Sequence, residues 1–202
     1  MPKVLISDAM DVIAEKILLE NNIDVDVKTD FTFDELIEKI PSYDGLIVRS
    51  ATKVTKEIIE NAKKLKLIGR AGAGVDNIDL PAAKEKNIIV MNTPGGNTNA
   101  TAEHTLALLL SLSRKIPNAD ATTHRGEWAK KRLKGNEIKG KTIGIIGFGN
   151  VGKRFAKMCY ALGLKVIILS KSFEVIKNDY PNYESINLSQ LLEEADIVSF
   201  HC

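Results

Sequence analysis

Short apolar runs alternate with stretches of helical period along almost the whole chain of 202 residues. Residues 3–7 and 45–50 have the length and composition of buried strands, whereas residues 11–21 and 32–40 repeat apolar side chains at helical spacing. Strands and helices that alternate at this spacing favour parallel sheets with crossover helices. The sequence therefore predicts an α/β protein. Further strands are predicted at 23–28, 65–72 and 87–93, and further helices at 55–63 and 79–86.

The alternation is interrupted by Pro94-Gly95-Gly96, and a long apolar helical segment follows at residues 101–116. Proline and glycine in succession are typical of a break between structural units. We therefore place a domain boundary near residue 94. The apolar helix is predicted to be buried, either in a core, which we favour, or against a second subunit.

Composition excludes several classes of protein. The chain is 44% hydrophobic and 27% charged, its net charge is +2, and it contains no run of like charges, so we expect no nucleic-acid partner. No apolar run approaches the ~18 residues of a membrane span, and no signal peptide precedes the first strand. The two cysteines form neither a disulfide framework nor a metal motif. We expect a cytoplasmic protein without a metal site, in which Cys159 is a small core residue.

The most informative local pattern is G-x-G-x-x-G, formed by Gly147, Gly149 and Gly152. It follows a predicted strand at 142–146 and precedes a helical segment and a second strand at 165–169, which is the context that dinucleotide binding requires. The first glycine allows the tight turn, the second lets backbone approach a pyrophosphate, and the third lets helix and strand pack closely. The free N–H groups at the helix start attract the negative charge. We predict binding of NAD or NADP here.

The end of the second strand bears on the choice between these two cofactors. An acidic residue usually stands there and binds the ribose hydroxyls of NAD, but this chain has Ser170 and Lys171. A carboxylate would repel a 2′-phosphate, whereas a lysine attracts one. The pair favours NADP, although Ser170 could bind the ribose of either cofactor and Lys171 could be a solvated surface charge.

Several motifs occur in an order that resembles the D-2-hydroxyacid dehydrogenase family. They cover essentially the whole chain. The resemblance implies a flavodoxin-like substrate domain, here residues 1–93, followed by an incomplete Rossmann-type nucleotide-binding domain, residues 94–202. It also implies oxidation of a 2-hydroxy acid by hydride transfer to a nicotinamide cofactor, in a homodimer or tetramer associated through the 101–116 region. The motifs are VRSATKVT (48–55), GRAGAGVDNIDLPAA (69–83), VMNTPGGNTNATAEHTLALLL (90–110) and GIIGFGNVGKRFA (144–156).

The resemblance also assigns substrate-binding residues. The loop that includes Ala73, Gly74 and Val75 resembles the one that receives the substrate carboxylate on backbone N–H groups, a task that suits close backbone approach. Arg49, Ser50 and Lys53 resemble residues that face the far end of the substrate. An arginine and a lysine there favour a phosphorylated 2-hydroxy acid, although a surface salt bridge is the alternative.

Other positions resemble residues of the family's domain cleft and cofactor site. Asn97, assigned to substrate binding, and Thr98, assigned to cofactor binding, match polar residues at the cleft. Asn150 and Val151 match residues that contact the pyrophosphate through backbone, and Cys202 falls where a loop passes the nicotinamide-side ribose. The basic residues Lys130, Lys131 and Arg132 could reach a neighbouring subunit's substrate, although a solvated face is the simpler interpretation.

No catalytic residue is assigned within the 202 residues. In the family, an arginine and a histidine–glutamate pair polarise the carbonyl and transfer the proton, and these would follow Cys202. We expect the chain alone to be inactive. The favoured reaction is oxidation of 3-phosphoglycerate to 3-phosphohydroxypyruvate, the first step of serine biosynthesis. The alternatives are an NADPH-dependent glyoxylate or hydroxypyruvate reductase, and a non-catalytic dinucleotide-binding dimerisation module.

Overall fold

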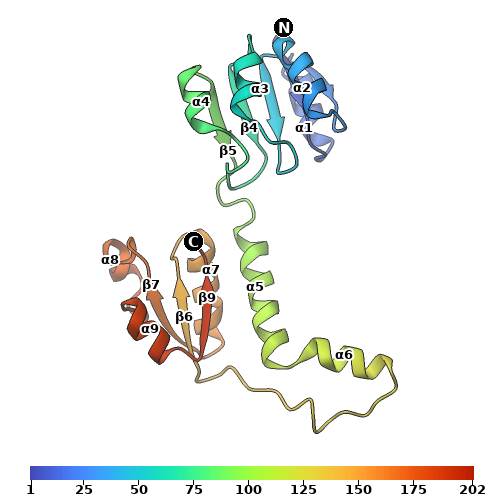
Figure 1. Ribbon diagram of the computed structural model, residues 1–202. Coiled ribbons are helices and arrows are strands. Elements are labelled where there is room, and N and C mark those ends of the chain that lie inside the picture. The colour runs from blue at the N-terminus through green and yellow to red at the C-terminus, as the bar shows by residue number, and fades with distance from the viewer. The chain divides into compact units, whose positions relative to one another are not determined.

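Parallel pairing organises the nine strands into two separate sheets (Figure 1). The computed structural model describes residues 1–202, and the chain divides between Gly96 and Asn97. We call Met1–Gly96 the N-terminal unit and Asn97–Cys202 the C-terminal unit, and each is described by itself. The substrate-binding role of the first part of the chain and the nucleotide-binding role of the second part stay predictions.

The N-terminal unit contains a five-stranded parallel sheet in the order β2-β1-β3-β4-β5. This is the flavodoxin-like order, as the resemblance implied. One side of the sheet packs Leu5, Leu46 and Ile68 against the helices, and all three side chains are fully buried. The elements are β1 (Lys3–Ile6), α1 (Ile13–Glu20), β2 (Asp24–Val27), α2 (Phe33–Lys39), a 3₁₀ turn (Ile40–Ser42), β3 (Gly45–Val48), α3 (Lys56–Asn61), β4 (Leu67–Arg70), α4 (Leu80–Glu85) and β5 (Ile89–Asn92).

Local sequence signals explain where these helices begin. Thr32 and Glu35 form the reciprocal capping box at the start of α2, because each side chain bonds the backbone N–H of the other residue. The side chain of Thr55 caps α3 by accepting a hydrogen bond from the backbone N–H of Ile58. The side chain of Asp79 caps α4 by accepting from the backbone N–H of Ala82, and Pro81 lies in the first turn of this helix. These caps fix the helices that follow the loops at the carboxyl ends of β3 and β4.

The C-terminal unit contains a four-stranded parallel sheet in the order β8-β7-β6-β9. Ile146 pairs with Leu169 on one side and with Phe200 on the other, so β6, β7 and β9 end at the same level. The loops after these strands therefore share one edge of the sheet. The elements are α5 (Thr98–Ser113), α6 (Ile116–His124), β6 (Thr142–Ile146), α7 (Asn150–Ala161), β7 (Lys165–Leu169), α8 (Phe173–Ile176), a 3₁₀ turn (Lys177–Asp179), β8 (Glu184–Ser185), α9 (Leu188–Glu194) and β9 (Ile197–Phe200).

The apolar helix α5 differs from the sequence prediction in both extent and burial. It ends at Ser113, and a second helix, α6, begins at Ile116, directly after the left-handed Lys115 (φ 53°). Only Ala102 and Leu109 of α5 are buried, whereas Leu112 is 79% exposed. The favoured interpretation of α5 as a core helix therefore holds for one side only: Ala102 and Leu109 belong to the core of the unit, where α5 packs against α7.

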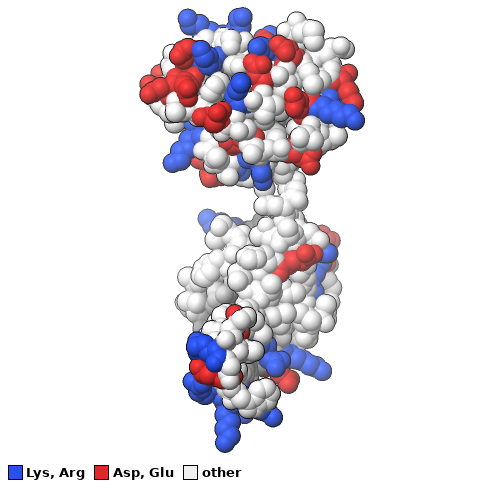
Figure 2. Space-filling view, turned by 90° about the vertical axis from the view of Figure 1, so that its right-hand side faces the viewer, with Lys and Arg blue, Asp and Glu red and all other residues white.

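The uncovered side of α5 belongs to a large uncharged surface. Figure 2 shows few charged side chains on the visible face of the C-terminal unit, whereas the N-terminal unit carries charges of both signs. Leu108 and Ile116 are 58% and 52% exposed, and Phe200 on the edge strand β9 is 71% exposed. This amount of exposed apolar surface is typical of an interaction face. No helix combines the length and the apolarity needed to cross a membrane.

Candidate functional site

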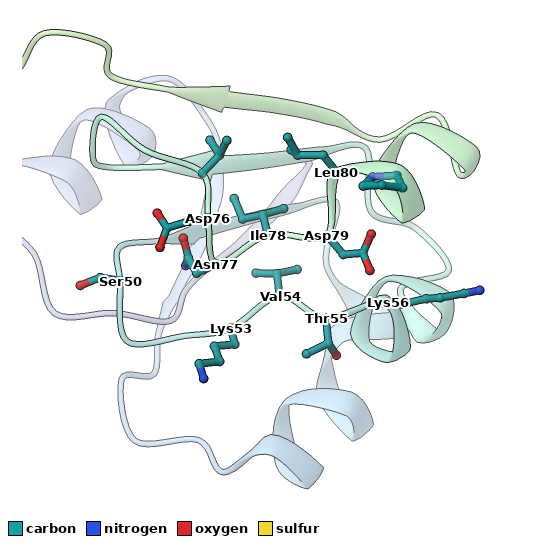
Figure 3. Close-up of a pocket in the computed structure, with 12 residues that line it drawn as sticks. Ser50, Lys53, Val54, Thr55, Lys56, Asp76, Asn77, Ile78, Asp79 and Leu80 are labelled. Atoms are coloured by element: carbon teal, nitrogen blue, oxygen red, sulfur yellow. The ribbon is translucent and has the colours of Figure 1, made fainter. Parts of the chain in front are cut away.

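The candidate substrate residues of the N-terminal unit lie at the carboxyl edge of its sheet. Ser50, Lys53 and Val75 line a pocket of about 720 Å³, together with residues of the loop that follows β4. In Figure 3, Ser50, Lys53 and Asn77 lie on one side of this pocket, while Lys56 extends away on the other. The structure therefore brings together a hydroxyl and an ammonium group from the loop after β3 with the glycine-rich loop after β4.

The loop after β4 offers unused hydrogen-bond donors. The backbone N–H groups of Ala73, Gly74 and Val75 donate to no other atom of the protein. Arg70, the last residue of β4, fixes this loop. Its guanidinium donates a hydrogen bond to the carbonyl oxygen of Gly74 and forms an ion pair with Asp76 at 3.4 Å. Successive free N–H groups on a fixed loop form an anion-binding site. This arrangement supports the predicted role in binding a carboxylate.

Not every predicted substrate residue faces the pocket. The guanidinium of Arg49 turns back and donates through Nη1 to the carbonyl oxygen of Ala9, at 3.2 Å. Ala73 and Gly74 are exposed next to the pocket but do not line it. Asn97 is the first residue of the C-terminal unit and is the N-cap of α5. The side chain of Arg49 is thus directed away from Ser50 and Lys53.

Sequence reasoning missed the residues that hold the two loops in place. Asp8 follows β1, and its carboxylate accepts hydrogen bonds from the loop after β3. The Asn77 side chain donates to the carbonyl oxygens of Arg49 and Thr52, at 2.8 and 2.6 Å. The side chain of Asn92, at the end of β5, donates to the carbonyl oxygen of Ala73 at 2.6 Å. Asp8 and Asn92 lie just beyond β1 and at the end of β5, and Asn77 lies in the loop after β4, but no local signal in the sequence marks the distant partners of these side chains.

The environment of Asp8 keeps it ionised. Burial alone would raise the pKa of its carboxyl group, since the residue is only 5% exposed. Hydrogen bonds from the Thr52 side chain and from the backbone of Arg49, Thr52 and Ala51 outweigh burial, so the pKa lies below its ordinary value of 3.8. Asp8 is therefore a buried anion that is satisfied by the loop it contacts.

The candidate cofactor residues of the C-terminal unit also meet at one sheet edge. Gly147, Gly149, Asn150, Val151 and Gly152 form the turn from β6 into α7. Ser170 and Lys171 follow β7, and their loop includes a contact of 3.1 Å between the hydroxyls of Ser170 and Ser172. Cys202 follows β9, and a Cβ atom on Gly147 would lie 3.0 Å from its backbone nitrogen. Thr98 begins α5, whose Asn99 accepts a hydrogen bond of 2.7 Å from Arg154 of α7.

The glycine loop fits a dinucleotide pyrophosphate. A Cβ atom on Gly152 would stand 2.2 Å from the carbonyl oxygen of Gly147, so helix and strand approach too closely for a side chain. A Cβ atom on Gly149 would meet nothing within 4 Å. Open space therefore lies over the start of the 12-residue helix α7, whose first N–H groups lack intrahelical partners. The loop thus presents the cradle that a phosphate group needs.

Aromatic packing fixes the glycine loop from behind. Phe148 is 1% exposed and meets Phe173 and Tyr180 edge-on, with ring centroids 5.1 Å apart in both pairs.

Cys159 is fully buried, as predicted, and burial raises the pKa of its thiol to about 12. Burial lowers the pKa of His201, which bonds Ser199 at 2.9 Å. Lys130, Lys131 and Arg132 lie on an exposed loop, where Arg132 pairs with Glu127 at 2.6 Å.

Comparison with known proteins agrees with this geometry. The sequence model described as the D-isomer specific 2-hydroxyacid dehydrogenase catalytic domain matches residues 4–197. The chain belongs to this family. Its members are oxidoreductases, which agrees with the dinucleotide-type glycine loop of the C-terminal unit.

Three relatives of this family member show how much of a longer protein it matches. The chain is 42% identical to D-3-phosphoglycerate dehydrogenase of Archaeoglobus fulgidus, and the match covers 98% of the chain and 38% of the relative. It is 44% identical to hydroxypyruvate reductase of Thermotoga maritima, and this match covers 98% of the chain and 64% of the relative. The NAD⁺-bound 3-phosphoglycerate dehydrogenase of Entamoeba histolytica has a TM-score of 0.79 and 33% identity, with 100% of this chain and 62% of that chain covered. The chain thus spans less than two thirds of the length of each.

Proposed function

We propose that the chain is the substrate- and cofactor-recognising part of a D-3-phosphoglycerate dehydrogenase, which oxidises 3-phosphoglycerate to 3-phosphohydroxypyruvate. The observation that carries the proposal is the pocket of the N-terminal unit. It places Lys53 and Ser50 beside a loop with three unused N–H donors at Ala73, Gly74 and Val75. These two features suit the two anionic ends of one substrate, a carboxylate and a phosphate.

Each end of the substrate has a distinct recognition chemistry in this proposal. The N–H groups of the loop after β4 bind the carboxylate and hold the adjacent carbon in a fixed position. The ammonium group of Lys53 and the hydroxyl of Ser50 bind the phosphate. Lys53 forms no ion pair with another residue of the chain, so its charge is available to a ligand. The Archaeoglobus and Entamoeba relatives, which are named for the phosphorylated substrate 3-phosphoglycerate, support this assignment.

The C-terminal unit binds the nicotinamide cofactor in this proposal. Gly147, Gly149 and the N-terminus of α7 hold the pyrophosphate, and Ser170 holds the ribose at the end of β7. A nicotinamide cofactor bound there would accept the hydride removed from C2 of the hydroxy acid. Lys171 is exposed and forms no ion pair, which favours NADP, whereas the Entamoeba relative carries NAD⁺. We expect the 202 residues alone to bind both ligands without turnover.

A second copy of the chain is the partner that the exposed side of α5 fits. Leu108 and Leu112 of α5, together with Phe200 of β9, form an apolar strip that the C-terminal unit leaves uncovered. We propose that this strip forms the interface of a homodimer or of a tetramer built from it. Burial of apolar side chains there would stabilise the assembly by ~25 cal/mol per Å².

The second candidate function is an NADPH-dependent hydroxypyruvate or glyoxylate reductase. The Thermotoga relative and the Ser170-Lys171 pair favour it. Isothermal titration calorimetry of the chain with 3-phosphoglycerate and with glycerate separates the two functions. If the chain belongs to a phosphoglycerate dehydrogenase, 3-phosphoglycerate should bind at least ~10-fold more tightly than glycerate, and Lys53→Met should remove this preference. Equal affinities for both acids would favour the reductase.

A further inference from the structure

The loop that carries Ser50 and Lys53 is short and irregular, and its position depends on contacts from its inner side. It connects β3 to the α3 cap at Thr55. Arg49, Ser50 and Lys53 are exposed, so their own side chains contribute little burial that could hold the loop. The groups that fix its backbone are therefore decisive for where Ser50 and Lys53 point.

Asp8 binds the inner side of this loop through its donors. Oδ2 accepts from the backbone N–H of Arg49 at 2.5 Å, and Oδ1 accepts from the backbone N–H of Thr52 at 3.0 Å. Oδ1 also accepts from the hydroxyl of Thr52 at 2.6 Å. Asp8 is 5% exposed, so water does not compete for these bonds. Hydrogen bonds to an ionised acceptor are stronger than neutral ones, and a carboxylate can accept several at once.

The carbonyl groups of the same two residues are bound from the other side. Asn77 donates through Nδ2 to the carbonyl oxygens of Arg49 and Thr52, and Arg70 Nε donates to that of Arg49 at 3.2 Å. The loop is therefore held between a carboxylate that accepts from its N–H groups and side chains that donate to its carbonyls. Asn77 and Arg70 also belong to the segment that contains the free N–H groups after β4. The arrangement fixes the two ends of the substrate pocket relative to each other.

We propose that Asp8 is a positioning residue for substrate binding, which acts by holding the 49–52 backbone so that Ser50 and Lys53 face the pocket. The proposal rests on the proposed function, because it assigns Asp8 to that substrate site. Asp8 does not line the pocket, so in this proposal it acts through the loop and not on the substrate directly. An asparagine at this position would replace one acceptor oxygen by an N–H₂ group, which would face a backbone donor instead of accepting from it.

The test compares Asp8→Asn with Asp30→Asn in the 202-residue chain. Asp30 is an exposed aspartate of the same unit whose side chain forms no hydrogen bond or ion pair, so its variant controls for the loss of one charge. Calorimetry gives the affinity for 3-phosphoglycerate, and NADPH fluorescence gives the affinity of the C-terminal unit for cofactor. Loss of one charge-assisted hydrogen bond corresponds to a change of ~10- to 100-fold in an equilibrium constant. We expect Asp8→Asn to weaken 3-phosphoglycerate binding by that factor and to leave NADPH binding unchanged.

Amide hydrogen exchange tests the positioning without any ligand. Asp8→Asn should accelerate exchange at the N–H groups of Arg49 and Thr52 by at least ~10-fold, while amides within β4 keep their protection. If the wild-type chain binds no 3-phosphoglycerate, the proposed function fails, and this exchange result alone decides the role of Asp8. Unchanged exchange at Arg49 and Thr52, or an unchanged 3-phosphoglycerate affinity in a wild type that binds, would overturn the proposal.

A milder pair of variants covers the case in which Asp8→Asn unfolds the N-terminal unit. Thr52→Ser keeps the hydroxyl that donates to Asp8, whereas Thr52→Val removes it at nearly constant volume. We expect Thr52→Ser to bind 3-phosphoglycerate as the wild type does and Thr52→Val to bind it several-fold more weakly. Equal affinities of the two variants would contradict the positioning role, because the serine keeps the hydroxyl that donates to Asp8 and contacts Ser7, whereas the valine loses it.

Discussion

Gly149 and Gly152 lie three residues apart in one loop, but the structure predicts opposite consequences for replacing them. A side chain on Gly149 enters open space over the start of α7, where its Cβ meets nothing within 4 Å. Gly149 has an extended backbone (φ −77°, ψ −162°) that any residue adopts. A side chain on Gly152 instead starts 2.2 Å from the backbone oxygen of Gly147, which cannot move away without distorting the turn. We therefore expect Gly149→Leu to block the cofactor and Gly152→Ala to disturb the fold.

The size of each effect follows from these contacts. Gly149 is the N-cap of α7, and replacing a favoured cap residue by an apolar one costs ~1 kcal/mol. Reduced freedom of the unfolded chain offsets ~0.4–1 kcal/mol of this, so the free energy of unfolding should change by less than ~1 kcal/mol. Forcing a methyl group into the backbone contact at Gly152 should cost ~1–3 kcal/mol. Filling the cradle at Gly149 should weaken NADPH binding by at least ~100-fold, which corresponds to about 2.7 kcal/mol.

Two assays measure these effects separately. Urea denaturation followed by circular dichroism gives the free energy of unfolding, and fluorescence titration gives the dissociation constant for NADPH. Ala161→Leu, at the exposed far end of α7, is the matched control and should change neither quantity. The reasoning is refuted if Gly149→Leu binds NADPH as the wild type does, or if it loses more than ~2 kcal/mol of stability while Gly152→Ala loses none.

Three further predictions concern the cofactor, a buried tyrosine and the exposed helix. Lys171→Glu should weaken NADPH binding at least ~10-fold more than NADH binding, because a carboxylate repels the 2′-phosphate; an unchanged ratio of the two dissociation constants would remove the preference for NADP. Burial and a 2.7 Å hydrogen bond to Asp26 raise the pKa of Tyr43 from 10.0 to about 12. The native state then holds this proton more tightly than the unfolded state, so the stability is complete below pH 10 and falls as the pH rises toward 12. Denaturation at pH 9 and pH 11 should show this loss in the wild type and a smaller one in Tyr43→Phe, and equal losses in both proteins would contradict the assignment. Leu112→Lys on α5 should convert a dimer to a monomer in analytical ultracentrifugation. Leu192→Lys on α9, where the leucine is also exposed, should leave the dimer intact. A wild type that is monomeric at all concentrations would contradict the proposed dimer interface on α5.

Local patterns in the sequence predicted most of the elements because each pattern has a local physical cause. The capping box at Thr32 and Glu35 predicted the start of α2 within one residue, since the cap bonds span only three positions. The alternating residues of 23–28 correspond to β2, and the apolar run before Gly147 corresponds to β6. The order of the strands in the N-terminal unit agreed with the fold that the resemblance implied.

The features that were missed depend on contacts between distant residues. The burial of α5 could not be judged from its composition, because an apolar helix has the same pattern whether its partner is its own core or another surface. The second helix, α6, was not predicted, because the apolar helix was extended to residue 116 and no local pattern marks the left-handed Lys115 between α5 and α6. Asp8 and Asn77 act on residues 41 and 28 positions away, and no local pattern marks such bonds. Arg49 was predicted to face the substrate, yet its guanidinium bonds the carbonyl oxygen of Ala9.

One nuclear magnetic resonance experiment tests the central claim, that the chain carries two separate recognition sites, one in each unit. The ¹⁵N-labelled chain is titrated first with 3-phosphoglycerate and then, in a second sample, with NADPH, and the amide shifts are mapped onto the sequence. The account predicts that 3-phosphoglycerate shifts the amides of Ser50, Lys53 and 73–75, and that NADPH shifts those of 147–152 and Lys171. Shifts from 3-phosphoglycerate that are absent, or that fall on residues outside the N-terminal pocket, would contradict it.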